Sequence, residues 1–145
     1  MASGGIHLVA GFALGSHCRS VPAALVAGAV SHGVLDAMPH RDYRYLAAHI
    51  SDGAVGVGLT GLLWRRCARE RRRHGLPGAI AAILPDVENV LVLLDLMDRE
   101  GVRCPSHSGL IPHGRANALQ TLLIYTIVGA ACWVAVRRPR EVTAA

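Results

Sequence analysis

The sequence has little of what a soluble enzyme usually contains. Charged residues make up only 17% of the 145 residues, against about 25% in a typical soluble domain. Aromatic residues reach 4%, and lysine is absent, so that all 15 basic residues are arginine. With 52% hydrophobic residues, this composition excludes a disordered chain and a large aromatic core, and it argues against an ordinary soluble enzyme. The length allows one domain, residues 1–145.

Recognisable cysteine and targeting motifs are also lacking. Cys18, Cys67, Cys104 and Cys132 share no CxxC spacing, so the sequence predicts no zinc ribbon, no thioredoxin-like motif and no disulfide framework. Arg19 is the first charged residue and follows the first apolar run. That order is typical of the first helix of a mature protein rather than of a cleaved signal peptide.

The apolar segments predict an all-α fold, a small integral-membrane bundle of about five helices. The clearest segment, Ala118 to Val136, carries no charge and ends near Trp133. As a helix it would span roughly 28 Å, close to the hydrocarbon core of about 30 Å, and Trp133 would suit the interface. Pro85 is expected to kink the fourth helix. The expected helices lie near residues 5–18, 22–38, 45–64, 78–97 and 117–137.

Arginine blocks set the expected orientation. One block follows the third predicted helix within residues 65–73, and another follows the fifth within 137–140. Because arginine is enriched in cytoplasmic loops, the C-terminal ends of the third and fifth predicted helices are expected on the cytoplasmic side. The sequence thus predicts a multi-pass protein of the bacterial inner membrane. A nucleic-acid partner is not expected, since next to a membrane segment these arginines are better explained by contacts with lipid phosphates. A soluble bundle of Ala-rich helices is the alternative.

Eight histidines are more than packing explains, and this topology gathers most of them at the extracytoplasmic end. Imidazole and carboxylate groups are the usual ligands of zinc and similar divalent ions. A carboxylate at the centre of a membrane costs about 2.5–3.5 kcal/mol, which a bound cation would offset. We expect one to three divalent ions, with zinc as the expected metal. The candidate ligands are His7, His32, Asp36, His40, His49, Asp52, Asp86, His107 and His113.

The spacing of these residues supports a shared face. His32, Asp36 and His40 recur every four residues, and side chains four apart lie on one face of a helix. Pro39 ends that helix, so His40 would have to turn back toward the others. Two further candidate ligands, His49 and Asp52, are three residues apart and again share a face.

Other polar residues have a simpler explanation. His17 and His74 fall at the opposite end, where we interpret them as packing residues. The whole set could also serve only to form hydrogen bonds between helices in a structural or assembly subunit.

Three short motifs resemble those of a known family. They are Ile6–His7, the segment Leu84–Pro85–Asp86–Val87–Glu88, and Ser106–His107–Ser108. Together the sequence resembles the bacterial membrane-bound metal-dependent hydrolases, which are distantly similar to zinc-dependent phospholipase C. Glu88 stands where that family often has a second aspartate. The resemblance implies a metal-dependent hydrolase.

The leading hypothesis is a metal-dependent hydrolase at the membrane surface that acts on a phosphoester or a lipid headgroup. A bound divalent ion lowers the pKa of its water toward about 7 and clamps phosphoryl oxygens. Glu88 is a candidate general base. The alternative is a non-enzymatic membrane protein that binds or transports metal. Because only apolar residues precede Asp86 within the fourth predicted helix, on its cytoplasmic side, a surface site is favoured over a polar route through the membrane.

Overall fold

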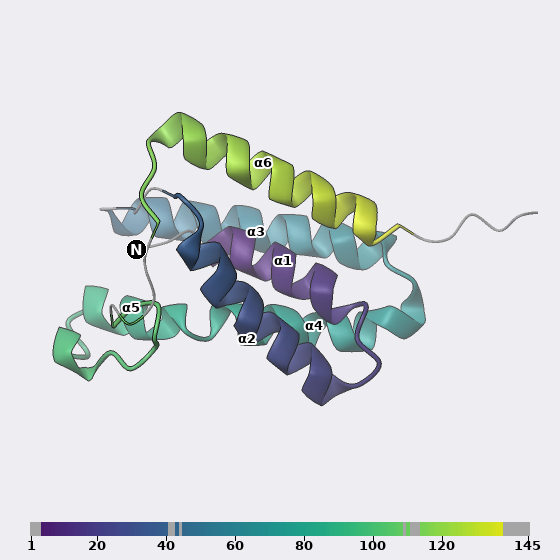
Figure 1. Ribbon diagram of the computed structural model, residues 1–145, viewed down its shortest axis with the longest axis horizontal. Helices are drawn as coiled ribbons and strands as arrows, with labels where there is room; N and C mark the ends of the chain where they lie inside the picture. The colour runs from purple at the N-terminus through teal and green to yellow at the C-terminus, as the bar shows by residue number, and fades with distance from the viewer. Residues whose placement is uncertain (1–3, 41–42, 44, 109, 111–113, 138–145) are drawn as a thin grey trace, which may run out of the picture.

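The computed structural model describes residues 4–40, 43, 45–108, 110 and 114–137, and this part of the chain is helical with no named strand (Figure 1). The predicted all-α fold is confirmed. The helices are α1 (Gly4–Gly15), α2 (Val21–Ala37), α3 (Leu46–Arg66), α4 (Arg69–Ile83), α5 (Asp86–Leu93), the 3-10 turn η1 (Arg99–Gly101) and α6 (Ala118–Ala135). His113 lies outside the described residues.

The fourth predicted helix, over 78–97, is wrong at both ends. Helix α4 already begins at Arg69, because arginine and glutamate are good helix formers and charge by itself does not end a helix. It stops at Ile83, and α5 continues from Asp86 at an angle of 45°. Pro85 has no N–H to donate to the preceding turn, so the helix breaks there instead of only bending.

Local signals explain where the other helices begin and end. The Ser20 hydroxyl accepts a hydrogen bond from Ala23 N at the start of α2, as an N-cap should. At the start of α6, Asn117 and Gln120 form a capping box, each side chain accepting from the other's backbone amide. These caps fix the starts of α2 and α6.

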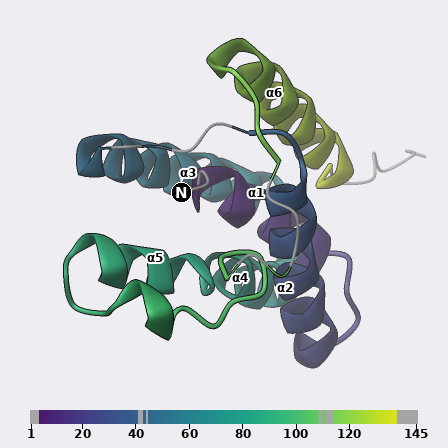
Figure 2. The same ribbon diagram turned by 60° about the vertical axis from the view of Figure 1, so that its left-hand side comes forward.

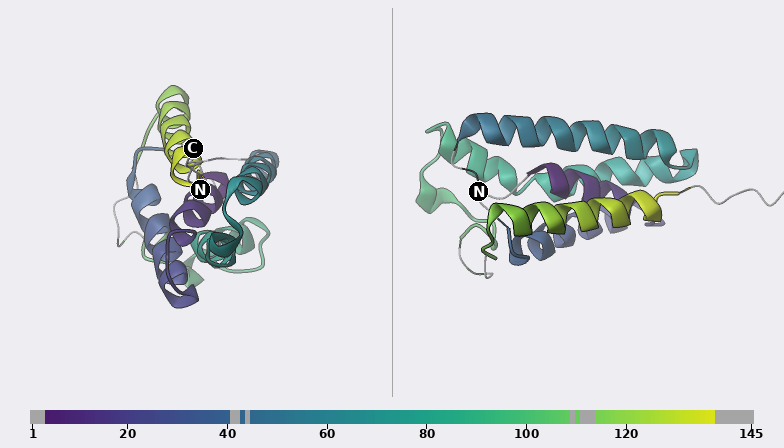
Figure 3. Two further views of the ribbon diagram at one scale, coloured as in Figure 1. Left: turned by 90° about the vertical axis from the view of Figure 1, so that its right-hand side faces the viewer. Right: turned by 90° about the horizontal axis from the view of Figure 1, so that it is seen from above.

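Helix α1 is the centre of the bundle and contacts α2, α3, α4 and α6. Figure 3 shows it surrounded by these helices in the view along the bundle, and Figure 2 shows α4 and α5 along one side. A side chain at Gly11 would lie 2.5 Å from the carbonyl oxygen of Gly78, so the backbones of α1 and α4 touch where they cross. Phe12 and Leu63 are buried in the core around this crossing.

Two helices of the described chain, α3 and α6, are long and apolar enough to cross a membrane. If α4 and α5 together form one bent span, the number of possible spans rises to three. Only 17% and 11% of the residues in their most apolar windows are buried within the protein. Large apolar side chains such as Val57 and Ile127 therefore point outward, with 64% and 68% of their surface exposed.

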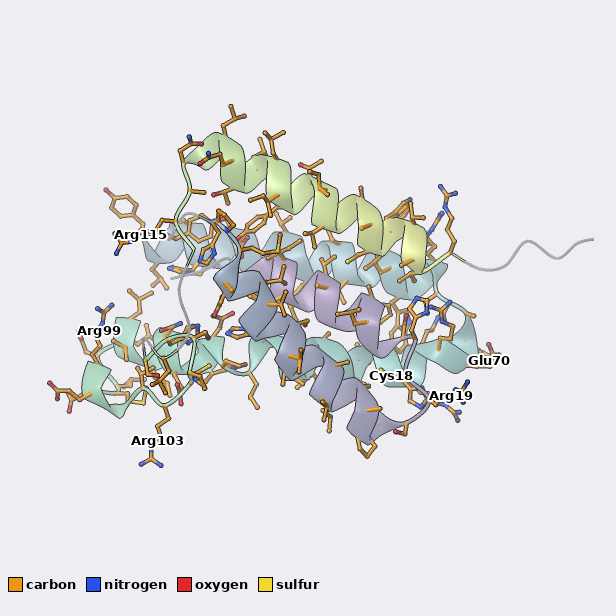
Figure 4. The ribbon with its side chains drawn as sticks, viewed as in Figure 1. Cys18, Arg19, Glu70, Arg99, Arg103 and Arg115 are labelled. Atoms are coloured by element: carbon orange, nitrogen blue, oxygen red, sulfur yellow. The ribbon has the colours of Figure 1, made fainter. Side chains whose placement is uncertain are left out.

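The bundle has two distinct polar ends. The start of α1, the end of α2, the junction of α4 with α5 and the start of α6 gather at one end, which we call the histidine end (Figure 1). Arg99, Arg103 and Arg115 lie at its rim, whereas Cys18 and Arg19 lie at the opposite end of the molecule (Figure 4). The predicted gathering of segments distant in sequence is thus present in the fold.

Candidate metal centre

Three imidazole rings face one buried carboxylate at the histidine end. The Nε2 atoms of His7, His32 and His107 lie 3.3, 3.0 and 3.2 Å from oxygens of Asp36. His7 and His32 are 1% exposed, and Asp36 is fully buried. Helix α1 supplies His7, α2 supplies His32 and Asp36 one turn apart, and the loop before α6 supplies His107. The structure therefore brings together four of the nine predicted ligands.

Asp86 forms the edge of this group. Its Oδ1 lies 3.5 Å from His107 Nε2, and its Oδ2 lies 4.0 Å from His32 Nδ1. The sequence interpretation placed Asp86 in the middle of a helix, but it is the first residue of α5. The break at Pro85 ends α4 beside the imidazoles, so Asp86 begins a new helix at the edge of the centre.

Several buried polar atoms here have no hydrogen-bond partner. They are His7 Nδ1, His32 Nε2, Asp86 Oδ2 and both carboxylate oxygens of Asp36. Leaving one such group unsatisfied costs about 1–3 kcal/mol, and native proteins keep few of them. Five such atoms meet at this one end of the bundle.

The donor set fits a divalent cation. Ligand atoms of His7, His32 and Asp36 all lie within 4.8 Å of one another. His7 Nε2 lies 3.3 Å from Oδ1 of Asp36, and His32 Nε2 lies 3.0 Å from Oδ2 of the same carboxylate. Nitrogen and carboxylate donors are also the types that zinc prefers.

Surrounding groups orient the imidazole rings. His32 Nδ1 lies 2.8 Å from the carbonyl oxygen of Ala82 on α4. Because a carbonyl only accepts, Nδ1 carries the proton of this contact, and Nε2 faces Asp36. The Asn89 amide nitrogen contacts the ring of His107 at 2.9 and 3.1 Å. An acceptor such as the Ala82 carbonyl is the kind of partner that orients metal-ligating histidines in known centres, whereas the Asn89 amide donates to the His107 ring.

Glu88 anchors the loop that carries His107. Its Oε2 accepts hydrogen bonds from the backbone amides of Arg103 and Cys104, at 3.0 and 2.9 Å. The carboxylate thus positions the loop from α5. The base role considered for Glu88 stays a prediction.

His40 is buried near the centre but is used differently. Its Nδ1 donates to the carbonyl oxygen of Met38 at 2.8 Å, and its own carbonyl accepts from Ala116 N at 3.0 Å. An isolated bridge pairs His40 with Arg115. His40 therefore connects the end of α2 to the segment before α6, and it belongs to no metal-compatible group found among the described residues.

His49 and Asp52 of α3 also lie outside those groups. Asp52 accepts a hydrogen bond from Gly5 N at 2.6 Å and another from the Tyr43 hydroxyl at 3.4 Å. His49 meets the Tyr43 ring edge-on, with centroids 5.4 Å apart. Backbone amides in the first turn of a helix have no acceptor within the helix, and Asp52 accepts from one of these in α1. The spacing of residues within α3 could not predict this contact with another helix.

Sequence reasoning missed Cys104. Its sulfur forms a second metal-compatible group with His32 and His107, whose ligand atoms lie within 4.8 Å of one another. Backbone amides of His107 and Ser108 both donate to the Cys104 carbonyl, at 3.0 and 2.8 Å. This tight turn brings Cys104 and His107 together, and the Cys-x-x-His spacing was the signal that could have identified it.

Comparisons with known proteins supply no relative. No family model, no curated protein and no solved structure matches the chain. The geometry of the centre is thus the basis on which a function is proposed.

Proposed function

We propose that the protein is an integral-membrane, metal-dependent hydrolase whose site lies at the outer surface of the bacterial inner membrane. The observation that carries this proposal is the convergence of buried ligand atoms from His7, His32 and Asp36, which all lie within 4.8 Å of one another. A divalent ion, with zinc as the expected metal, would satisfy them together. The resemblance of the three sequence motifs to membrane-bound metal-dependent hydrolases supports the same assignment.

The outward apolar faces of α3 and α6 support the membrane part of the proposal. Monomeric soluble proteins rarely expose contiguous apolar surfaces of more than a few hundred Å², whereas lipid covers such faces at no cost. Exposed Arg65 and Arg69 flank the turn between α3 and α4, and arginines mark cytoplasmic loops. The histidine end would then face away from the cytoplasm.

The residues divide into holding and positioning roles. His7, His32 and Asp36 would hold the ion, with Asp86 and His107 beside it. When bound, a divalent ion supplies a hydroxide nucleophile at neutral pH and polarises a phosphoryl oxygen. Ala82 fixes the tautomer of His32 through its carbonyl. Neutral imidazole nitrogen is the form that binds metal.

A cavity beside Asp86 suits a substrate with an apolar part. It has a volume of about 260 Å³ and lies between α3 and the α4–α5 junction. Ile83, Val87 and Val90 make most of its wall apolar, and Asn89 and Asp86 supply polar atoms. This combination supports a phosphoester in a lipid headgroup as the substrate class, because one wall would take the apolar part while the reacting group meets the polar atoms.

Metal transport, the second possibility, would need a polar path that leads away from the centre. Beyond His7, the next buried side chains of α1 are Val9, Ala10, Phe12 and Ala13. An ion leaving the centre along this helix would lose its ligands in an apolar core. The packing therefore favours a fixed site.

The test is metal analysis of purified protein, followed by hydrolysis assays. We expect bound divalent metal in the wild type and in His17→Ala, a matched control at the opposite end, but not in His32→Ala. Activity on a panel of phosphodiesters and phospholipids should be lost with a chelator and return with zinc. Protein that folds but binds no divalent ion would refute the proposal, and metal without any hydrolysis would leave only a binding protein.

A further inference from the structure

The two metal-compatible groups at the histidine end share one residue. His32 belongs both to the group with His7 and Asp36 and to the group with Cys104 and His107. The two groups would describe two separate ions only if His32 offered a different nitrogen to each. Its hydrogen bonding decides between one position and two.

His32 has a single nitrogen to offer. Nδ1 lies 2.8 Å from the Ala82 carbonyl oxygen and carries the proton of that contact. Nε2 is buried, has no hydrogen-bond partner and lies 3.0 Å from Asp36. Because a nitrogen lone pair binds one metal ion, the two groups can share an ion only through Nε2.

We propose that Cys104 is a thiolate ligand of the ion bound at His32, so that the centre contains sulfur as well as nitrogen and oxygen. This inference rests on the proposed metal site and adds a ligand that neither the spacing of the histidines nor the resembled motifs contain. The thiol proton passes to solvent when the sulfur binds. A thiolate shifts the preference of the centre toward zinc and other thiophilic ions and away from magnesium, calcium or manganese.

The loop holds Cys104 in place for this role. Glu88 accepts a hydrogen bond from the Cys104 amide at 2.9 Å, and the Cys104 carbonyl accepts one from the His107 amide at 3.0 Å. The Ser106 hydroxyl lies 3.3 Å from the sulfur. It is placed to donate to a thiolate, and such charge-assisted bonds are among the strongest in proteins.

The test uses Co²⁺ in place of zinc, because a thiolate bound to cobalt produces a charge-transfer band in the near ultraviolet. We expect this band in the wild type and in Cys18→Ser, whose residue lies at the opposite end (Figure 4). Cys104→Ser should lose it while keeping the visible bands of bound cobalt. Visible bands without the ultraviolet band in the wild type, or a band that survives in Cys104→Ser, would overturn the sulfur ligand and leave the metal site standing. No cobalt binding at all would overturn both proposals.

A second measurement avoids dependence on the folding of Cys104→Ser. Zn²⁺ should protect Cys104 of the wild-type protein from alkylation in detergent, and a chelator should restore its labelling, as followed by peptide mass spectrometry. Half-buried Cys18 is the internal control and should label equally in both conditions. Equal labelling of Cys104 with and without zinc, in protein shown to hold the metal, would overturn the proposal.

Discussion

The two ends of the bundle use the same residue type in opposite ways. His32 at the histidine end and His17 at the other end each lie within hydrogen-bonding distance of a backbone carbonyl, that of Ala82 at 2.8 Å and that of Ala135 at 3.0 Å. The remaining nitrogen of His32 is buried and without a hydrogen bond. His17 is exposed, so water can reach its ring.

Two arginines of the opposite end, Arg66 and Arg71, contact other groups within the fold. Arg71 donates to the Ser16 carbonyl at 2.9 Å, and the guanidinium of Arg66 stacks over Trp133 at 4.2 Å. Toward this end of α3, Thr60 Oγ1 and Arg66 Nε are buried without a hydrogen bond. The opposite end is thus held by contacts within the fold, whereas the histidine end gathers the atoms on which the proposed metal site rests.

The largest expected effect is the loss of metal in Asp36→Asn. This change removes the charge that three imidazoles face, and we expect the affinity for zinc to fall by more than about 100-fold, since losing an outer partner alone costs 10–100-fold. Competition with a chelating dye measures it. Asp52→Asn is the matched control and should bind like the wild type, and unchanged affinity in Asp36→Asn would place the ion elsewhere.

Metal should stabilise the histidine end. Zinc that binds only the folded state, at 100 times its Kd, adds about 2.7 kcal/mol to the free energy of unfolding. Thermal unfolding in detergent, with zinc or with a chelator, should show a higher Tm with zinc for the wild type and no shift for Asp36→Asn. Equal shifts in both proteins would mean that zinc acts at another place.

Asp52→Ala should separate stability from metal binding. Without its acceptor, the Gly5 amide at the start of α1 is left unpaired, at a cost of about 1–3 kcal/mol. We therefore expect a lower Tm and an unchanged metal content. If folded Asp52→Ala lost its metal, Asp52 would be a metal ligand after all, as the sequence predicts.

Glu88→Gln tests whether loop anchoring matters to the centre. An amide oxygen is a weaker acceptor for the Arg103 and Cys104 amides than a carboxylate, so the loop with His107 should loosen and zinc affinity should fall by about tenfold. Isothermal titration measures this, with Glu70→Gln at the opposite end as control. If activity disappears while affinity stays unchanged, Glu88 is the general base.

The smallest effect is expected at the opposite end. His17→Ala removes contacts of an exposed ring with Ala135 and Arg71, and a hydrogen bond of this kind contributes about 0.5–1.5 kcal/mol to stability. Zinc affinity should not change. If His17→Ala reduced metal binding as much as Asp36→Asn, metal binding would not be specific to the histidine end, and the distinction between the two ends would be wrong.

Much of the candidate centre was predictable from sequence. The spacing of His32 and Asp36 put them on one face, and the order of apolar segments placed His7, Asp86 and His107 at the same end. Asp52, His49 and His40 fall at that end too, but their side chains contact other groups. Topology places residues at an end of the bundle, whereas only packing determines the direction in which a side chain points.

By itself, the sequence determined the helical fold and the two ends, because apolar periodicity, caps and proline act over a few residues. The tertiary structure decided the loop contact of Glu88 and the approach of Cys104 to His32. Each of these depends on contacts between segments distant in sequence, whose geometry is set by how α1, α2 and α4 pack around small residues. Local patterns therefore identified the ligand types, and only the packed bundle selected those that meet.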